Sequence, residues 1–129
     1  MQITHVNPDP LFTTPAFSQA VTVEGASKIT FVGGQNGINI DGELVGDDLA
    51  TQTEQAFGNV LECLKAVGAS QDDVVKLTIN IVEGQDVNLG FAASQKIWGE
   101  HPTAISVAII AALAVPGALV EIDAVAVTG

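Results

Sequence analysis

The C-terminal stretch of the chain restricts the fold more than any other part of the sequence. Residues 105–110 are almost all apolar, which is typical of a strand covered on both faces, and residues 119–127 are apolar and largely β-branched except for Glu121 and Asp123. Pro116-Gly117 lies between them and predicts a turn. Because side chains alternate along a strand, the two carboxylates should point to the same face. The stretch therefore predicts two long strands, one of which carries an acidic pair.

The rest of the chain predicts further strands and two amphipathic helices. Hydrophobic periodicity places strands at 2–6, 17–24 and 28–32, a helix at 49–67, a strand at 75–81 and a helix at 85–98. The turn residues Gly25-Ala26-Ser27 predict that the second and third strands pair as a hairpin. Gly33-Gly34 follows and indicates either a β-bulge or a close approach to the backbone. We therefore expect one α+β domain, residues 1–129, with both helices on one face of a mixed sheet.

The composition is more apolar than a small monomer needs to fill its own core. Hydrophobic residues make up 47% of the chain, charged residues 15%, and the mean hydropathy is +0.40. This surplus predicts a buried interface between subunits. No apolar run approaches the roughly 18 residues of a membrane span, and the N-terminus lacks a basic segment followed by an apolar one. We expect a cytoplasmic protein with no membrane partner.

The charge balance argues against nucleic-acid partners. Fifteen acidic residues face only four basic ones, all lysines, and the formal net charge is −11. Nucleic-acid binding depends on clustered Lys and Arg that neutralise phosphates, and no basic patch is present. His5 and His101 lack the spacing of metal ligands, and we expect structural roles for them, with no metal and no cofactor. Cys63 lies in an apolar stripe and is expected to be a small core residue.

Several segments resemble the Rid family of reactive-intermediate deaminases, also called the YjgF or L-PSP endoribonuclease-like family. The segments that carry the resemblance are Phe17-Ser18-Gln19-Ala20-Val21, Gly34-Gln35, residues 50–70, Asp73-Val74-Val75-Lys76-Leu77-Thr78 and Pro116-Gly117-Ala118-Leu119-Val120-Glu121-Ile122. The resemblance covers almost the whole chain. It implies a compact homotrimer with three equivalent clefts between subunits, in which water attacks a carbon–nitrogen double bond of a small molecule.

The resemblance also shows where this chain departs from the family. In the deaminase members an arginine after the Pro-x dipeptide grips the substrate carboxylate, through two parallel charged hydrogen bonds. That position is Ala104 here, followed by Ile105 and Ser106, and the chain contains no arginine at all. Losing a charged partner worth about 1.5–3 kcal/mol should weaken recognition of a 2-imino acid by at least one to two powers of ten.

Other predicted cleft positions are more apolar than the family pattern. Phe17 stands at the usual tyrosine, Gly33 at a serine, and Phe91 at an asparagine of the second helix, so hydroxyl and amide donors are lost. Both phenylalanines could equally be packing residues of a subunit interface. Gly34 and Glu121 match the family's cleft glycine and glutamate. Glu121 either holds water or a cationic nitrogen, or only accepts hydrogen bonds from backbone donors.

Three functions remain open from the sequence. The first is an enzyme that hydrolyses a neutral or cationic imine or enamine, with the Gly34 backbone and Glu121 orienting the water. The second is a non-catalytic trimer whose cleft binds a small metabolite. The third is a purely structural trimer with a protein partner. The missing arginine favours the second, whereas the family resemblance favours the first.

We expect no detectable binding of single-stranded or structured RNA at physiological salt, because a chain of charge −11 without a basic patch repels phosphates. Fluorescence anisotropy with labelled RNA checks this, and micromolar affinity would contradict it.

Overall fold

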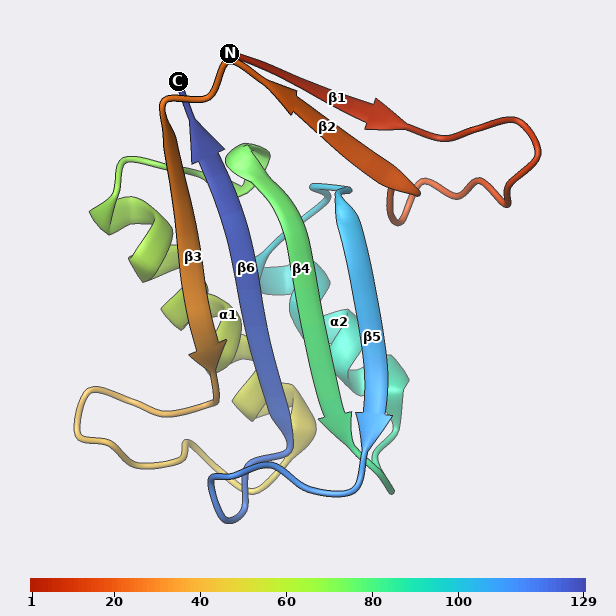
Figure 1. The fold of residues 1–129 in the computed structure, drawn as a ribbon. Coiled ribbons are helices and arrows are strands. Elements are labelled where there is room, and N and C mark those ends of the chain that lie inside the picture. Colours follow the sequence, from red (N-terminus) through yellow and green to blue (C-terminus); the bar gives the residue numbers. More distant parts are fainter.

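A four-stranded mixed sheet forms the centre of the computed structural model, which describes all residues from 1 to 129 (Figure 1). Its strands are β3 (Lys28–Gln35), β6 (Val120–Thr128), β4 (Val74–Val82) and β5 (Ala104–Ile110), in that spatial order. Only β4 and β5 run parallel, and the other neighbours are antiparallel. The first two strands, β1 (Gln2–Val6) and β2 (Ala20–Glu24), form a separate antiparallel pair.

Both helices cover the same face of the sheet, as predicted (Figure 1). Helix α1 (Leu49–Ala66) and helix α2 (Val87–Ile97) lie behind the strands, and a short 3₁₀ turn (Gln71–Asp73) precedes β4. The predicted α+β architecture is therefore confirmed. Neither α-helix combines the length and the apolar character that crossing a bilayer requires.

Alternation along the strands gives the sheet one apolar face and one mixed face. On β6 the even-numbered residues from Val120 to Ala126 are buried under α1, while Glu121 and Asp123 point to the opposite side. We call this opposite side, which neither helix covers, the open face. The prediction that the two carboxylates share a face thus agrees with the burial pattern of the strand.

The predicted hairpin of residues 17–24 with residues 28–32 is wrong. Strand β2 pairs with β1, whereas β3 pairs with β6 along the edge of the main sheet. Gly25, at φ +72°, lets the chain turn out of one sheet and into the other. Pairing with β6 lets β3 bury its Val32 side chain in the main core, where it is only 6% exposed. A separate two-stranded hairpin would not bury this side chain.

The prediction that residues 105–110 are covered on both faces also fails for a single chain. Strand β5 is the last strand of the sheet, and its side chains Val107 and Ile109 are 59% and 55% exposed. Apolar side chains of this size are therefore left in contact with solvent at an edge of the sheet.

Helix α1 begins and ends with ordinary capping groups. The Asp48 carboxylate accepts a hydrogen bond from the Thr51 N–H at 2.9 Å, and this bond lowers the pKa of Asp48. Gly68, at φ +74°, follows the last turn, as the sequence predicts. Cys63 is half-buried and packs against the core, which agrees with its predicted role.

One buried amide, that of Gln52 on α1, joins the helix to two loops. Gln52 is fully buried; its Nε2 donates to the carbonyls of Gly46 and Gly117, and its Oε1 accepts from Leu119 N–H. Gly37 packs so closely on this residue that an added Cβ would lie 2.7 Å from the Gln52 Cα. All polar atoms of the amide are therefore paired with backbone.

Replacing Gln52 with Leu should lower the free energy of unfolding by about 2–4 kcal/mol, because the backbone groups at Gly46, Gly117 and Leu119 lose their partner. Urea denaturation at fixed protein concentration measures this. Gln95→Leu, on the exposed side of α2, is the control and should change stability by less than about 0.5 kcal/mol. Equal effects of the two changes would contradict the role of the amide.

Candidate functional site

The predicted site residues fall into two groups on the sheet, and the first lies where β5 begins. The Ser18 N–H donates to the Thr103 carbonyl at 2.8 Å, and Ser18 forms a bridge with Ala104. This contact brings half-buried Phe17, the residue before Ser18, close to the start of β5 at Ala104. Ser18 is itself held by His5, whose Nδ1 lies 2.8 Å from the Ser18 Oγ. His5 therefore has the structural role expected for it.

A lysine that the sequence did not single out lies in this first group. Lys76 of β4 is in register with Ala104, and its Nζ donates to the Ser106 Oγ at 2.6 Å. Neither of the two ion pairs of the chain includes Lys76. The alternating polar face of residues 75–81 was a signal that could have revealed it. Lys76 supplies a point charge here, but an ammonium cannot form the planar two-bond contact of an arginine.

The second group, Gly33, Gly34 and Glu121, lies at the other end of the sheet. The pairing of β3 with β6 slips between Val32 and Gln35, so the two glycines occupy a β-bulge, which is one of the two features that the glycine pair indicated. The Glu121 side chain fills the space above Gly34, where an added Cβ would lie 2.7 Å from the carboxylate. Gly33 has open space instead. The structure thus brings the two predicted catalytic residues, Gly34 and Glu121, into contact on a half-exposed surface.

Strand register keeps the two groups apart within one chain. Ala104 aligns with Lys76 on β4, which aligns with Val125 on β6, four residues beyond Glu121. That offset corresponds to about 13 Å along the strands and about 10 Å across them. Phe91 belongs to neither group, because it lies on α2, which covers the face of the sheet opposite to the one that Glu121 occupies. A single subunit does not bring all predicted site residues together.

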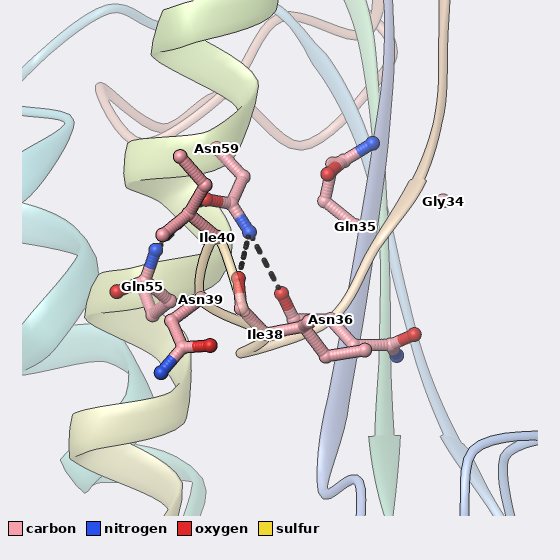
Figure 2. Close-up of a pocket in the computed structure, with 8 residues that line it drawn as sticks. All are labelled: Gly34, Gln35, Asn36, Ile38, Asn39, Ile40, Gln55 and Asn59. Atoms are coloured by element: carbon pink, nitrogen blue, oxygen red, sulfur yellow. Dashed lines mark hydrogen bonds between the residues drawn. The ribbon is translucent and has the colours of Figure 1, made fainter. Parts of the chain in front are cut away.

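An amide-lined pocket of about 510 Å³ adjoins Gly34 (Figure 2). Figure 2 shows Asn59 of α1 pointing at the loop that follows β3, where its Nδ2 donates to the carbonyls of Asn36 and Ile38. Gln55 Nε2 in turn donates to Asn59 Oδ1 at 2.8 Å. These amides hold the loop against α1, and none of the lining residues is charged. The pocket therefore suits neutral polar groups better than ions.

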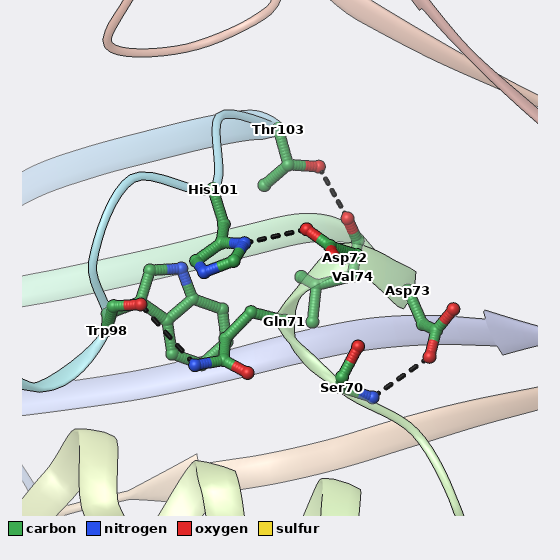
Figure 3. Close-up of polar contacts among 8 residues, drawn as sticks. All are labelled: Ser70, Gln71, Asp72, Asp73, Val74, Trp98, His101 and Thr103. Carbon is green, nitrogen blue, oxygen red and sulfur yellow. Dashed lines mark hydrogen bonds and ion pairs between the residues drawn. The ribbon is translucent and has the colours of Figure 1, made fainter.

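A cluster of polar contacts fixes the chain just before β5 (Figure 3). The Thr103 hydroxyl donates to the Val74 carbonyl at 2.8 Å, and His101 Nδ1 lies 2.7 Å from the Asp72 carboxylate. The His101 ring also meets Trp98 edge-on. His101 therefore has the structural role that the sequence predicts, and these contacts set the position of Ala104.

Most of the chain matches known proteins of one family. The family model described as Endoribonuclease L-PSP matches residues 9–128. Human 2-iminobutanoate/2-iminopropanoate deaminase is 32% identical over 114 residues, which cover 88% of this chain and 80% of that protein. Protein DfrA of Myxococcus xanthus is 36% identical over 118 residues, which cover 87% and 85%.

Solved structures show the same relationship. The Rid-family protein YyfB of Yersinia pestis, whose function is unknown, superposes with a TM-score of 0.85 at 34% identity, covering 98% of this chain and 99% of that one. A structure from Thermotoga maritima described as a possible endoribonuclease gives a TM-score of 0.72 at 30% identity, covering 91% and 95%. The family-model match, the sequence relatives and the shared fold agree, and the chain belongs to the Endoribonuclease L-PSP family, also called the Rid or YjgF family.

Proposed function

We propose that this protein hydrolyses a neutral or cationic imine or enamine, at a cleft shared by two subunits of a homotrimer. The separation of the two residue groups along the sheet carries this proposal. If Ala104, Ser106 and Lys76 act with Gly34 and Glu121, the two sets have to come from different chains. The deaminase relatives support the choice of reaction.

The chemistry needs little beyond a positioned water molecule. Water adds to the carbon of the C=N bond while the nitrogen takes up a proton, and the resulting amino alcohol releases ammonia and leaves a carbonyl group. Glu121 is suited to accept a hydrogen bond from the attacking water and to pass its proton to the departing nitrogen. Gly34 leaves the room that this carboxylate occupies, since any side chain there would collide with it.

The missing arginine sets the proposed substrate apart from a 2-imino acid. Lys76 is in register with Ala104, but its ammonium already donates a hydrogen bond to Ser106. The net charge of −11 further disfavours an anionic substrate. The family description names an endoribonuclease, but the same charge makes a small molecule the better candidate.

The missing arginine also supports one alternative, a trimer that binds a small metabolite or a protein partner without catalysis. Hydrogen-bond donors predicted from the family are replaced by the apolar Phe17 and Phe91 and by Gly33. A cleft of this kind keeps its shape but has fewer groups to stabilise a developing charge.

Exposed apolar side chains support the proposed assembly. On the open face of β3, Ile29 and Phe31 are 58% and 77% exposed, and the β5 edge adds Val107 and Ile109. Side chains of this size are costly to leave in water, at about 1.5–3 kcal/mol each. Contact between such surfaces of neighbouring chains would bury them.

We expect light scattering to give the mass of three 13.2 kDa chains, about 40 kDa. Phe31→Asp should shift the protein toward the monomer, because it puts a charge into the proposed interface. Glu62→Lys, a charge change on the exposed side of α1, is the control and should leave the mass unchanged. A wild-type mass near that of one chain would contradict the shared cleft.

We expect the wild type to accelerate hydrolysis of butan-2-imine, generated in situ, and to leave 2-iminobutanoate close to its rate in buffer. The two compounds differ only in one group, because butan-2-imine has a methyl group where 2-iminobutanoate has its carboxylate. Glu121→Gln should lower the first activity by about tenfold or more, since the amide cannot accept the water proton. Stopped-flow measurement of imine loss, together with ammonia release, gives the rates.

Introducing an arginine at position 104 tests whether the missing carboxylate contact limits the activity. Ala104→Arg should raise turnover of 2-iminobutanoate by about ten- to a hundredfold, because a bidentate contact to the carboxylate is restored. Ala108→Arg places the same charge on the same strand and face, and is the control. If the wild type already hydrolyses 2-iminobutanoate well, the importance given to the missing arginine is wrong. If neither imine reacts faster with any variant, the non-catalytic alternative holds.

A further inference from the structure

Three loops meet at the end of the sheet where β3, β4 and β5 finish (Figure 1). They follow these strands along the chain and comprise residues 36–48, 83–86 and 111–119. The Gln52 amide joins the first loop to the third, through the carbonyls of Gly46 and Gly117. The Glu83 N–H donates to the Ile110 carbonyl at 2.8 Å, which joins the second loop to the end of β5. We call the surface that these loops form the loop end.

The charged groups of the loop end are all acidic. Its loops contain no lysine and no histidine, and their carboxylates, all on exposed residues, are Asp41, Glu43, Asp47, Asp48, Glu83 and Asp86. Neither ion pair of the chain includes one of them. Lys28 and Lys76 lie near the starts of β3 and β4, and Lys65 and Lys96 lie near the ends of α1 and α2. All four cations of the chain are therefore displaced toward the opposite end of the molecule.

An apolar loop adjoins both acidic loops. Residues 111–119 carry no polar side chain. The exposed members of this loop are Ala111, Ala112, Ala114, Pro116 and Gly117. An added Cβ at Gly117 would lie 3.2 Å from Leu44 Cδ1, so the loop packs against residues 36–48, where Ile40 is 100% exposed. Exposed apolar surface with a polar rim is typical of a site that contacts another molecule.

Charge complementarity decides what kind of molecule suits the loop end. A second copy of the chain has the same net charge of −11, and anionic lipids or nucleic acids carry phosphates, so each would be repelled. A metal ion is no better suited, because no three metal-ligating side chains come together to hold one. A polypeptide with both cationic and apolar side chains matches the acidic rim and the apolar loop at once.

We propose that the loop end is a docking surface for a basic amphipathic segment of another protein. The apolar side chains of that segment pack on residues 111–117 and on Ile40, and its lysine or arginine side chains pair with the surrounding carboxylates. The Gly34–Glu121 contact and the sheet surfaces assigned to the subunit contact take no part. The docking surface is therefore independent of the proposed imine hydrolysis.

Calorimetry of the purified protein with three synthetic peptides tests this proposal. A peptide of three Leu-Lys-Lys-Leu repeats supplies both features and should bind with a Kd on the order of 10 μM at low ionic strength. Replacing its leucines with glycine should weaken binding about tenfold or more, because the apolar contact is lost. Replacing its lysines with glutamate should abolish binding, because like charges then meet.

Two double variants of equal net charge locate the surface. Asp41→Asn with Glu43→Gln neutralises part of the loop end, and should weaken the leucine–lysine peptide about fivefold or more. Glu24→Gln with Glu62→Gln removes two exposed carboxylates elsewhere, and should leave the Kd within about twofold. None of these four carboxylates takes part in an ion pair, and both variants lose the same two negative charges. Any difference between them therefore depends on position.

Ile40→Ser tests the apolar contact. Ile40 is fully exposed, so the change should leave the fold intact and weaken the leucine–lysine peptide about threefold or more. Leu11→Ser is the control, since Leu11 is 50% exposed in the loop between β1 and β2, and it should leave the Kd within about twofold.

Equal effects of the two double variants would show that binding follows net charge alone, and would overturn the docking surface. Equal affinity for the leucine and glycine peptides, or no binding of the leucine–lysine peptide to the wild type, would also overturn it. A mass that rises with protein concentration in the wild type but not in Ile40→Ser would assign the loop end to a second copy of the chain instead.

Discussion

The buried amide of Gln52 is the contact on which the Gly34–Glu121 region depends. It holds the loop after β3 through Gly46 and the loop before β6 through Gly117 and Leu119. Glu121 follows Leu119 by two residues, and Gly34 precedes the tightly packed Gly37 by three. A side chain in the first turn of α1 therefore sets the spacing of two strands that carry the proposed chemistry. The amide is fully paired, so this spacing is held without an orphaned polar group.

Local sequence patterns predicted the helices and strands well, because the spacing of apolar residues along the sequence matches the spacing of the buried side chains in each element. The helix at 49–67 and the strand at 75–81 correspond to α1 and β4 within a few residues. Pairing was harder to predict. The turn at Gly25-Ala26-Ser27 looked like a hairpin, yet β3 pairs with β6, a strand close to it in space but far away in sequence. A turn pattern describes where the chain bends and carries no information about which edge is free.

The candidate site was predictable only in part. Gly34 and Glu121 could be named from family resemblance, and the structure brings them into contact. Lys76 was not singled out, since its contact with Ser106 joins residues thirty positions apart in sequence.

The distance between the two ends of the sheet has a consequence for inheritance. In the proposed trimer, each polypeptide would contribute one half of a site to one neighbour and the other half to the second neighbour. A chain defective only at the Ala104 end and a chain defective only at the Glu121 end could then restore working sites when they assemble together. Two damaged alleles in one cell would complement each other, which is not possible for a site contained in one chain.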